Sequence, residues 1–160
     1  MPSDAVRICG IDPGLNITGY ATVDFAGRDP AIVEAGAIRT EAHAPLADRI
    51  ARIYAELGEL LGELAPDVVA IEKLYAHYKH PRTAILMAHA RGIVLLAARQ
   101  AGRTVRDLAA TEVKKALTGN GHASKRQVQH AVQSVCKLTE LPEPPDVADA
   151  LAIALCAGRR

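Results

Sequence analysis

Four acidic residues lie at the ends of predicted strands and helices, where together they could do chemistry. Asp12 ends one short apolar segment and Glu72 ends another, whereas Asp146 and Asp149 follow a cluster of prolines. The three-residue spacing of the last two places both side chains on one face of a helix. Carboxylate oxygens are the ligands that hard cations such as Mg²⁺ prefer. Two such ions about 4 Å apart activate water and stabilise a leaving oxygen, so this set suits metal-dependent phosphodiester hydrolysis.

Each of these positions also has a purely structural explanation. A carboxylate at the end of a strand can accept backbone N–H bonds, which would account for Asp12 and Glu72 without catalysis. Acidic side chains near a helix N-terminus are favoured by capping and by the helix dipole, which would account for Asp146 and Asp149. The metal-site interpretation is favoured by the four together, because each lies at the end of a predicted element.

The formal net charge of +1 conceals an uneven distribution along the chain. Residues 1–72 carry 5 basic and 12 acidic side chains, residues 73–137 carry 12 basic and 2 acidic, and residues 138–160 carry 2 basic and 4 acidic. If the middle segment folds onto one face, its net charge of +10 suits a polyanion such as nucleic acid. A solvated helix surface is the alternative explanation for these charges.

The elements that must position the acidic residues follow from hydrophobic periodicity and from breaker residues. Strand-like segments, short and apolar or rich in β-branched residues, cover residues 6–12, 17–24, 31–39, 68–72 and 104–108. Helical patterns cover residues 46–64, 83–101, 111–117, 124–136 and 146–157. Ser124 and Gln127 have the spacing of a capping box at the start of the fourth helix. This alternation predicts a layered α/β domain, and the chain length predicts a single domain over residues 1–160.

Composition excludes several classes of protein. The chain is 49% hydrophobic, but no run approaches the roughly 18–20 consecutive apolar residues that span a bilayer. The first residues lack the basic flank and the apolar region of a signal peptide. Cys9, Cys136 and Cys156 are far apart, which predicts neither a disulfide framework nor a zinc site. We therefore expect a cytoplasmic protein that does not bind membranes.

Seven motifs follow one another over nearly the whole chain. They are Gly10-Ile11-Asp12-Pro13-Gly14, Ala70-Ile71-Glu72, Ala90-Arg91-Gly92, Glu112-Val113-Lys114-Lys115, Thr118-Gly119-Asn120-Gly121, Lys125-Arg126-Gln127-Val128-Gln129-His130, and Asp146-Val147-Ala148-Asp149-Ala150-Leu151-Ala152-Ile153-Ala154. In order and spacing they resemble the RuvC family of Holliday junction resolvases.

The resemblance implies a ribonuclease H-like α/β fold, with a five-stranded mixed sheet, its first three strands antiparallel, and helices on both faces. It implies that Asp12, Glu72, Asp146 and Asp149 are the catalytic, metal-binding carboxylates, with two Mg²⁺ ions per site and Mn²⁺ as a substitute. The implied activity is symmetric nicking of four-way junction DNA by a homodimer in recombination and repair, which leaves 5′-phosphate and 3′-hydroxyl ends. A branch-migration motor complex of the same pathway is a further implied partner.

The resemblance also assigns residues to DNA binding. Tyr75 matches an aromatic residue that meets bases near the crossover, where stacking on a base contributes roughly 1–3 kcal/mol. Lys114 and Lys125 match functional lysines that contact phosphates. Lys79 and Arg82 are further candidates for DNA binding.

Two features depart from the family pattern. The segment between Glu72 and Ala90 is one residue longer than the usual version, and the chain ends soon after its last predicted helix. His77 and His80 stand at i and i+3, but the sequence offers no third ligand at suitable spacing, and Pro81 disturbs helicity. A DNA-facing loop is therefore favoured over a transition-metal site.

Three other functions stay open from the residues. The turn after the first strand is shared with actin-like ATPases, although 160 residues are few for two lobes around a nucleotide. The basic middle segment also suits a nucleic-acid-binding module without catalysis, and the fold alone suits a ribonuclease H-like nuclease acting on RNA or damaged DNA. ATP binding would identify the first, and loss of cleavage on replacing one carboxylate would exclude the second.

Overall fold

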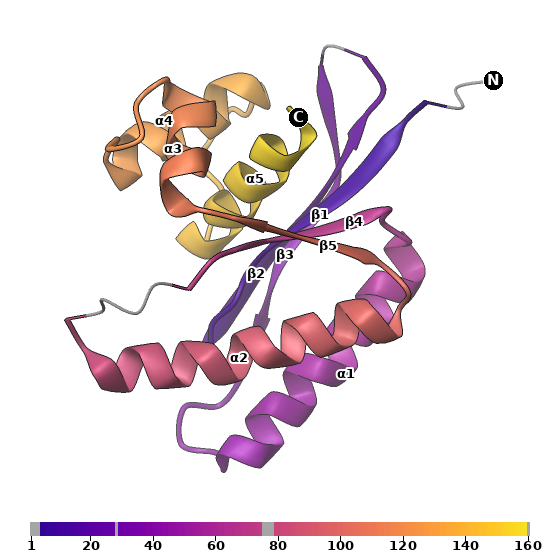
Figure 1. Ribbon diagram of the computed structural model, residues 1–160, viewed down its shortest axis with the longest axis vertical. Helices are drawn as coiled ribbons and strands as arrows, with labels where there is room; N and C mark the ends of the chain where they lie inside the picture. The colour runs from indigo at the N-terminus through magenta and orange to yellow at the C-terminus, as the bar shows by residue number, and fades with distance from the viewer. Residues whose placement is uncertain (1–3, 28, 75–78, 160) are drawn as a thin grey trace.

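The centre of the fold is one mixed sheet. The computed structural model describes residues 4–27, 29–74 and 79–159 (Figure 1). The strands are β1 (Val6–Asp12), β2 (Ile17–Phe25), β3 (Pro30–Arg39), β4 (Val68–Glu72) and β5 (Thr104–Leu108). They lie in the order β3-β2-β1-β4-β5, with β1–β2 and β2–β3 antiparallel and β1–β4 and β4–β5 parallel. The predicted five-stranded mixed sheet is confirmed, and every strand begins and ends within one residue of its predicted bounds.

Helices cover both faces of this sheet, as predicted. In the described part of the chain they are α1 (Leu46–Leu64), α2 (Pro81–Gln100), α3 (Ala110–Thr118), α4 (Lys125–Val135) and α5 (Pro145–Gly158). One apolar core lies between the sheet and α1 with α2, and the other lies between the sheet and α3, α4 and α5 (Figure 1). No helix among the described residues is both long and apolar enough to cross a membrane.

Local sequence signals account for several helix starts. α2 begins at Pro81, two residues before its predicted start, because the fixed φ of proline suits the first helical position. At the start of α4 the predicted capping box is confirmed: the backbone N–H of Ser124 donates to Gln127 Oε1 (2.8 Å), and that of Gln127 donates to Ser124 Oγ (3.1 Å). α5 begins at Pro145 and its N-cap is Pro144, without a side-chain capping bond.

Two glycines allow α5 to lie directly on the sheet. A Cβ atom on Gly10 of β1 would come within 2.2 Å of the Ala150 carbonyl oxygen, and one on Gly19 of β2 would come within 2.2 Å of the Asp146 carbonyl oxygen. Neither position tolerates a side chain, because both contacts are with helix backbone. Gly19 is also the register partner of Asp12. The first turn of α5 is therefore held next to the end of β1.

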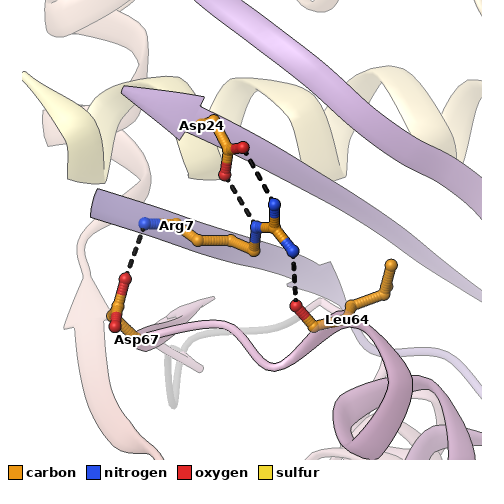
Figure 2. A network of polar contacts seen from close by, with 4 residues as sticks. All are labelled: Arg7, Asp24, Leu64 and Asp67. Carbon is orange, nitrogen blue, oxygen red and sulfur yellow. Dashed lines mark hydrogen bonds and ion pairs between the residues drawn. The ribbon is translucent and has the colours of Figure 1, made fainter. Parts of the chain in front are cut away.

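A polar network holds the opposite end of β1 (Figure 2). The guanidinium of Arg7 donates to both carboxylate oxygens of Asp24 (2.7 and 2.9 Å) and to the Leu64 carbonyl oxygen (2.8 Å). The backbone N–H of Arg7 donates to the Asp67 carboxylate (2.8 Å). This network joins β1 to β2 and to the end of α1, so it stabilises the sheet at the end remote from Asp12.

Candidate active site

The fold brings the four predicted carboxylates together. Asp12 and Glu72 end β1 and β4, which are neighbouring parallel strands, so their side chains emerge at the same edge of the sheet. The first turns of α5 bring Asp146 and Asp149 to this edge. Asp12, Glu72 and Asp149 line a cavity of about 250 Å³, and Asp12, Asp146 and Asp149 line an adjoining groove of about 540 Å³. The four residues thus form one acidic centre, although they come from three separate parts of the chain.

Asp12, Glu72 and Asp149 resist ionisation. Burial, followed by the charges of Asp149, Asp146 and Glu72, raises the pKa of Asp12 to about 8. Burial and the charge of Asp149 raise the pKa of Glu72, and burial raises the pKa of Asp149. Backbone N–H bonds to a carboxylate would lower its pKa, so the raised values disfavour the strand-end explanation for Asp12 and Glu72. Asp146 lies in the first turn of α5, so its charge also suits the helix dipole, and its N-cap neighbour Pro144 has no side-chain acceptor.

The donor set fits a hard divalent cation. All four side chains supply oxygen, and a cation between them would offset the burial and the repulsion that together raise the pKa of Asp12. Within the residues that the structure describes, no group of three or more histidine, cysteine, aspartate or glutamate side chains already has the spacing of a metal centre. Metal binding to such carboxylates is coupled to their deprotonation, so the affinity of this centre for a cation should rise with pH.

Two of the predicted lysines border the carboxylates. Lys125, the first residue of α4, places its Nζ 3.3 Å from Asp149 Oδ2. Lys114 of α3 lines the same cavity, and its charge lowers the pKa of Glu72 against the effect of burial. The cavity therefore combines carboxylates, which can bind a metal ion, with two ammonium groups, which can bind a phosphate.

The other predicted DNA contacts lie elsewhere or outside the described residues. Lys79 and Arg82 are exposed beside and within the first turn of α2, and they line neither the cavity nor the groove at the carboxylates. His80 is exposed and is the N-cap residue of α2. Tyr75, His77 and the rest of the unusual run before Lys79 lie outside the described residues.

One residue at the site had no role assigned from the sequence. Arg91 of α2 donates from Nε to the Glu72 carbonyl oxygen (3.4 Å) and forms an ion pair with Asp107 of β5. It therefore holds the end of β4 that presents Glu72. The only sequence signal for Arg91 is its place in the Ala90-Arg91-Gly92 motif, because its two partners lie 19 and 16 residues away.

Similar proteins identify the family. The family model described as "Crossover junction endodeoxyribonuclease RuvC" matches residues 8–157. A curated relative of that name from Rhodopirellula baltica is 48% identical over 155 residues, covering 97% of this chain and 87% of the relative. One from Pelotomaculum thermopropionicum is 44% identical over 149 residues, covering 93% and 90%.

Solved structures give the same result. Thermus thermophilus RuvC is similar with a TM-score of 0.86 and 35% identity, covering 94% of this chain and 92% of that one. The same protein in complex with a Holliday junction substrate gives a TM-score of 0.88 and 36% identity with the same coverage. The yeast mitochondrial Holliday junction resolvase, 14% identical with a TM-score of 0.64 and covering 96% of this chain and 79% of that one, shares the fold.

These matches decide between the classes of protein that the sequence left open. The relatives are named as endodeoxyribonucleases, and the matched range, residues 8–157, spans the positions of the acidic centre. The actin-like ATPase interpretation therefore has no support. With its ribonuclease H-like fold and a family model that extends over almost its whole length, this chain belongs to the crossover junction endodeoxyribonuclease RuvC family.

Proposed function

We propose that this chain resolves four-way (Holliday) DNA junctions in recombination and repair by nicking two symmetry-related strands. The convergence of Asp12, Glu72, Asp146 and Asp149 beside two lysines is the observation that carries the proposal. The similar Thermus thermophilus RuvC in complex with a Holliday junction substrate supports the choice of DNA. Hydrolysis would leave 5′-phosphate and 3′-hydroxyl ends, which a ligase can rejoin.

The four carboxylates are proposed to hold Mg²⁺, with Mn²⁺ as a substitute and two ions per site. When bound, these ions supply the activation of the attacking water and the stabilisation of the leaving oxygen. The raised pKa of Asp12 supports this assignment, because a group that resists ionisation next to three other carboxylates is stabilised by a neighbouring cation.

The lysines are proposed to bind phosphate oxygens at and near the scissile bond. In the DNA-free chain the Lys125 ammonium partly neutralises Asp149 at 3.3 Å. Once a cation neutralises the carboxylates, the Lys125 ammonium is free to turn to a phosphate. Lys114 is held on the other helix that borders the cavity, so the two lysines would contact the DNA strand from α3 and α4.

Further DNA contacts are proposed at the start of α2. Lys79 and Arg82 are exposed there, and α2 has no acidic residue in its first turn, so this end of the helix attracts phosphates. Tyr75 remains the proposed residue for stacking on a base near the crossover, which would hold the junction open.

A homodimer is proposed to act on the two opposite strands. α1 and α2 carry an exposed apolar surface, in which Leu96 is 46% exposed and borders a shallow depression with Ile50, Tyr54 and Ile93. Exposed apolar patches of this kind mark interaction surfaces, and a second copy would bring a second acidic centre to the junction. A branch-migration motor complex is the further proposed partner.

The chain is proposed to act as a single domain over residues 1–160 in the cytoplasm. Both apolar cores lie on the faces of one sheet, which supports one folding unit. Cys9, Cys136 and Cys156 are free thiols, which supports a reducing compartment.

The proposal is tested with a mobile synthetic four-way junction whose strands are labelled in turn, with Mg²⁺ or with a chelator. The chain is expected to make paired, symmetry-related nicks only with metal. Asp146→Asn should abolish nicking and keep junction binding, whereas the matched Asp48→Asn, at an exposed position in the first turn of α1, should nick as the parent does. Tight junction binding without nicks under any metal would instead indicate a binding module, and nicking confined to RNA would indicate a different nuclease.

A further inference from the structure

The groove at the carboxylates extends beyond them to a residue with no assigned role. Asp12, Asp146 and Asp149 line the groove at one end, and Lys125 lies beside them. The groove then passes the turn between β1 and β2 and reaches the first turns of α1 and α2, where Arg49 is part of its wall. Arg49 therefore faces the same continuous space of about 540 Å³ as three of the four carboxylates.

Neutral oxygen atoms hold the Arg49 guanidinium in place. Its Nε donates to Thr40 Oγ1 (2.9 Å), and its Nη2 donates to Asn16 Oδ1 (2.5 Å). Thr40 is itself fixed, because its hydroxyl donates to the Leu15 carbonyl oxygen (2.5 Å) and its backbone N–H donates to the Asn16 carbonyl oxygen (3.1 Å). The side chain is thus oriented against the β1–β2 turn before any ligand arrives.

The partners of Arg49 distinguish it from other arginines of the fold. Arg7, Arg52 and Arg91 form ion pairs with carboxylates. Among the ion pairs between described residues, none involves Arg49. Its partners take up two of the five N–H donors of the guanidinium and none of its charge. A rigid, charged guanidinium with donors to spare is the group that best recognises phosphate.

We propose that Arg49 binds a phosphate of the DNA strand that lies in this groove, next to the phosphate that is cut. The inference rests on the proposed function, because that function places DNA at the carboxylates. Lys125 at the acidic end and Arg49 at the far end would then contact the backbone of one strand at two points. Arg49 would set the register of the strand relative to Asp146 and Asp149, since phosphate contacts position a nucleic acid without reading its sequence.

The test compares Arg49→Gln and Arg49→Lys with Arg52→Gln. Arg52 is the matched control because it lies one turn further along α1, is half exposed and already pairs with Glu56. Binding of labelled four-way junction and of linear duplex is measured between 50 and 200 mM salt in an Asp146→Asn background, so that cleavage does not interfere. Thermal unfolding of each variant is followed in parallel.

Arg49→Gln is expected to weaken junction binding about tenfold, as for the loss of one charged hydrogen bond. The slope of log K against log salt should fall by about 0.9, as for one fewer phosphate contact. Arg49→Lys should keep the slope, and Arg52→Gln should change neither quantity. An unchanged slope in Arg49→Gln, or an equal change in Arg52→Gln, would overturn the inference, whatever the unfolding temperature.

The two proposals fail in different ways. If the parent chain nicks junctions while Arg49→Gln binds DNA as tightly and with the same salt slope, the Arg49 site is wrong and the proposed function stands. If DNA binding depends on Arg49 but no metal supports nicking by the parent chain, the Arg49 site stands and the proposed function is wrong.

Discussion

Replacing Asp12 by asparagine is expected to stabilise the metal-free protein at neutral pH. Burial and three neighbouring carboxylates raise the pKa of Asp12 from 3.8 to about 8, so the folded state binds a proton here that the unfolded state has released at pH 7. Asparagine has the same shape and carries no charge. The substitution therefore removes a group whose ionisation opposes folding.

The size of this effect follows from proton linkage. Between pH 3.8 and pH 7 lie about 3.2 pH units at about 1.36 kcal/mol each, so Asp12 opposes folding by about 4 kcal/mol at pH 7. Asparagine still buries a polar group, which leaves an expected gain of about 2–4 kcal/mol. For a chain of this length that corresponds to a rise in Tm of roughly 5–15 °C.

The sign of the pH dependence is the sharper part of the prediction. A carboxyl whose pKa is raised on folding contributes stability at low pH and loses it as the pH rises from 3.8 through about 8. Unfolding by urea in chelator should therefore show the parent chain losing stability between pH 5 and pH 8, with a flatter profile for Asp12→Asn. Added Mg²⁺ should stabilise the parent chain more than the variant.

Asp24→Asn is the matched control with the opposite sign. The Arg7 guanidinium lowers the pKa of Asp24, so this ionised carboxylate stabilises the fold and its replacement should destabilise it (Figure 2). If Asp12→Asn is no more stable than the parent chain in chelator at pH 7, or if both have the same pH profile, burial and neighbouring charges do not raise the pKa of Asp12 as described above.

Three further substitutions test other parts of the structure. Arg91→Gln should lower kcat for junction nicking about tenfold and leave the junction Kd unchanged, because it releases the strand end that presents Glu72. Arg91→Lys should recover part of the rate, and an effect on Kd alone would contradict a positioning role. Gly10→Ala should lower the free energy of unfolding in urea by several kcal/mol, since its Cβ would meet the α5 backbone at 2.2 Å. Gly58→Ala, at an open position inside α1, should raise it by about 0.5–1 kcal/mol. Similar values for the two variants would contradict the close packing of α5. Leu96→Asp should convert the proposed dimer to monomer in sedimentation at micromolar concentration, and an unchanged sedimentation coefficient would remove this surface from the interface.

Much of the fold could be predicted from the sequence, because its signals are local. Strand bounds follow from short apolar runs ended by glycine and proline, and the start of α4 follows from the capping box of Ser124 and Gln127. Acidic residues at the ends of apolar strands indicated Asp12 and Glu72, and the motif order indicated the family. The first turn of α2 was harder to place, because Pro81 disturbs a helix interior but suits a helix start.

The assembly of the site depends on contacts that local patterns do not contain. Asp12 and Glu72 become neighbours because β1 and β4 pair in parallel, and α5 reaches them because Gly10 and Gly19 leave room for its backbone. Helix capping and metal binding both favour an acidic side chain near a helix start. The sequence therefore indicated Asp146 as a candidate and left its role open. Only the tertiary structure shows that Asp146 lines the same groove as Asp12 and Asp149, since this proximity depends on distances across the fold rather than along the chain.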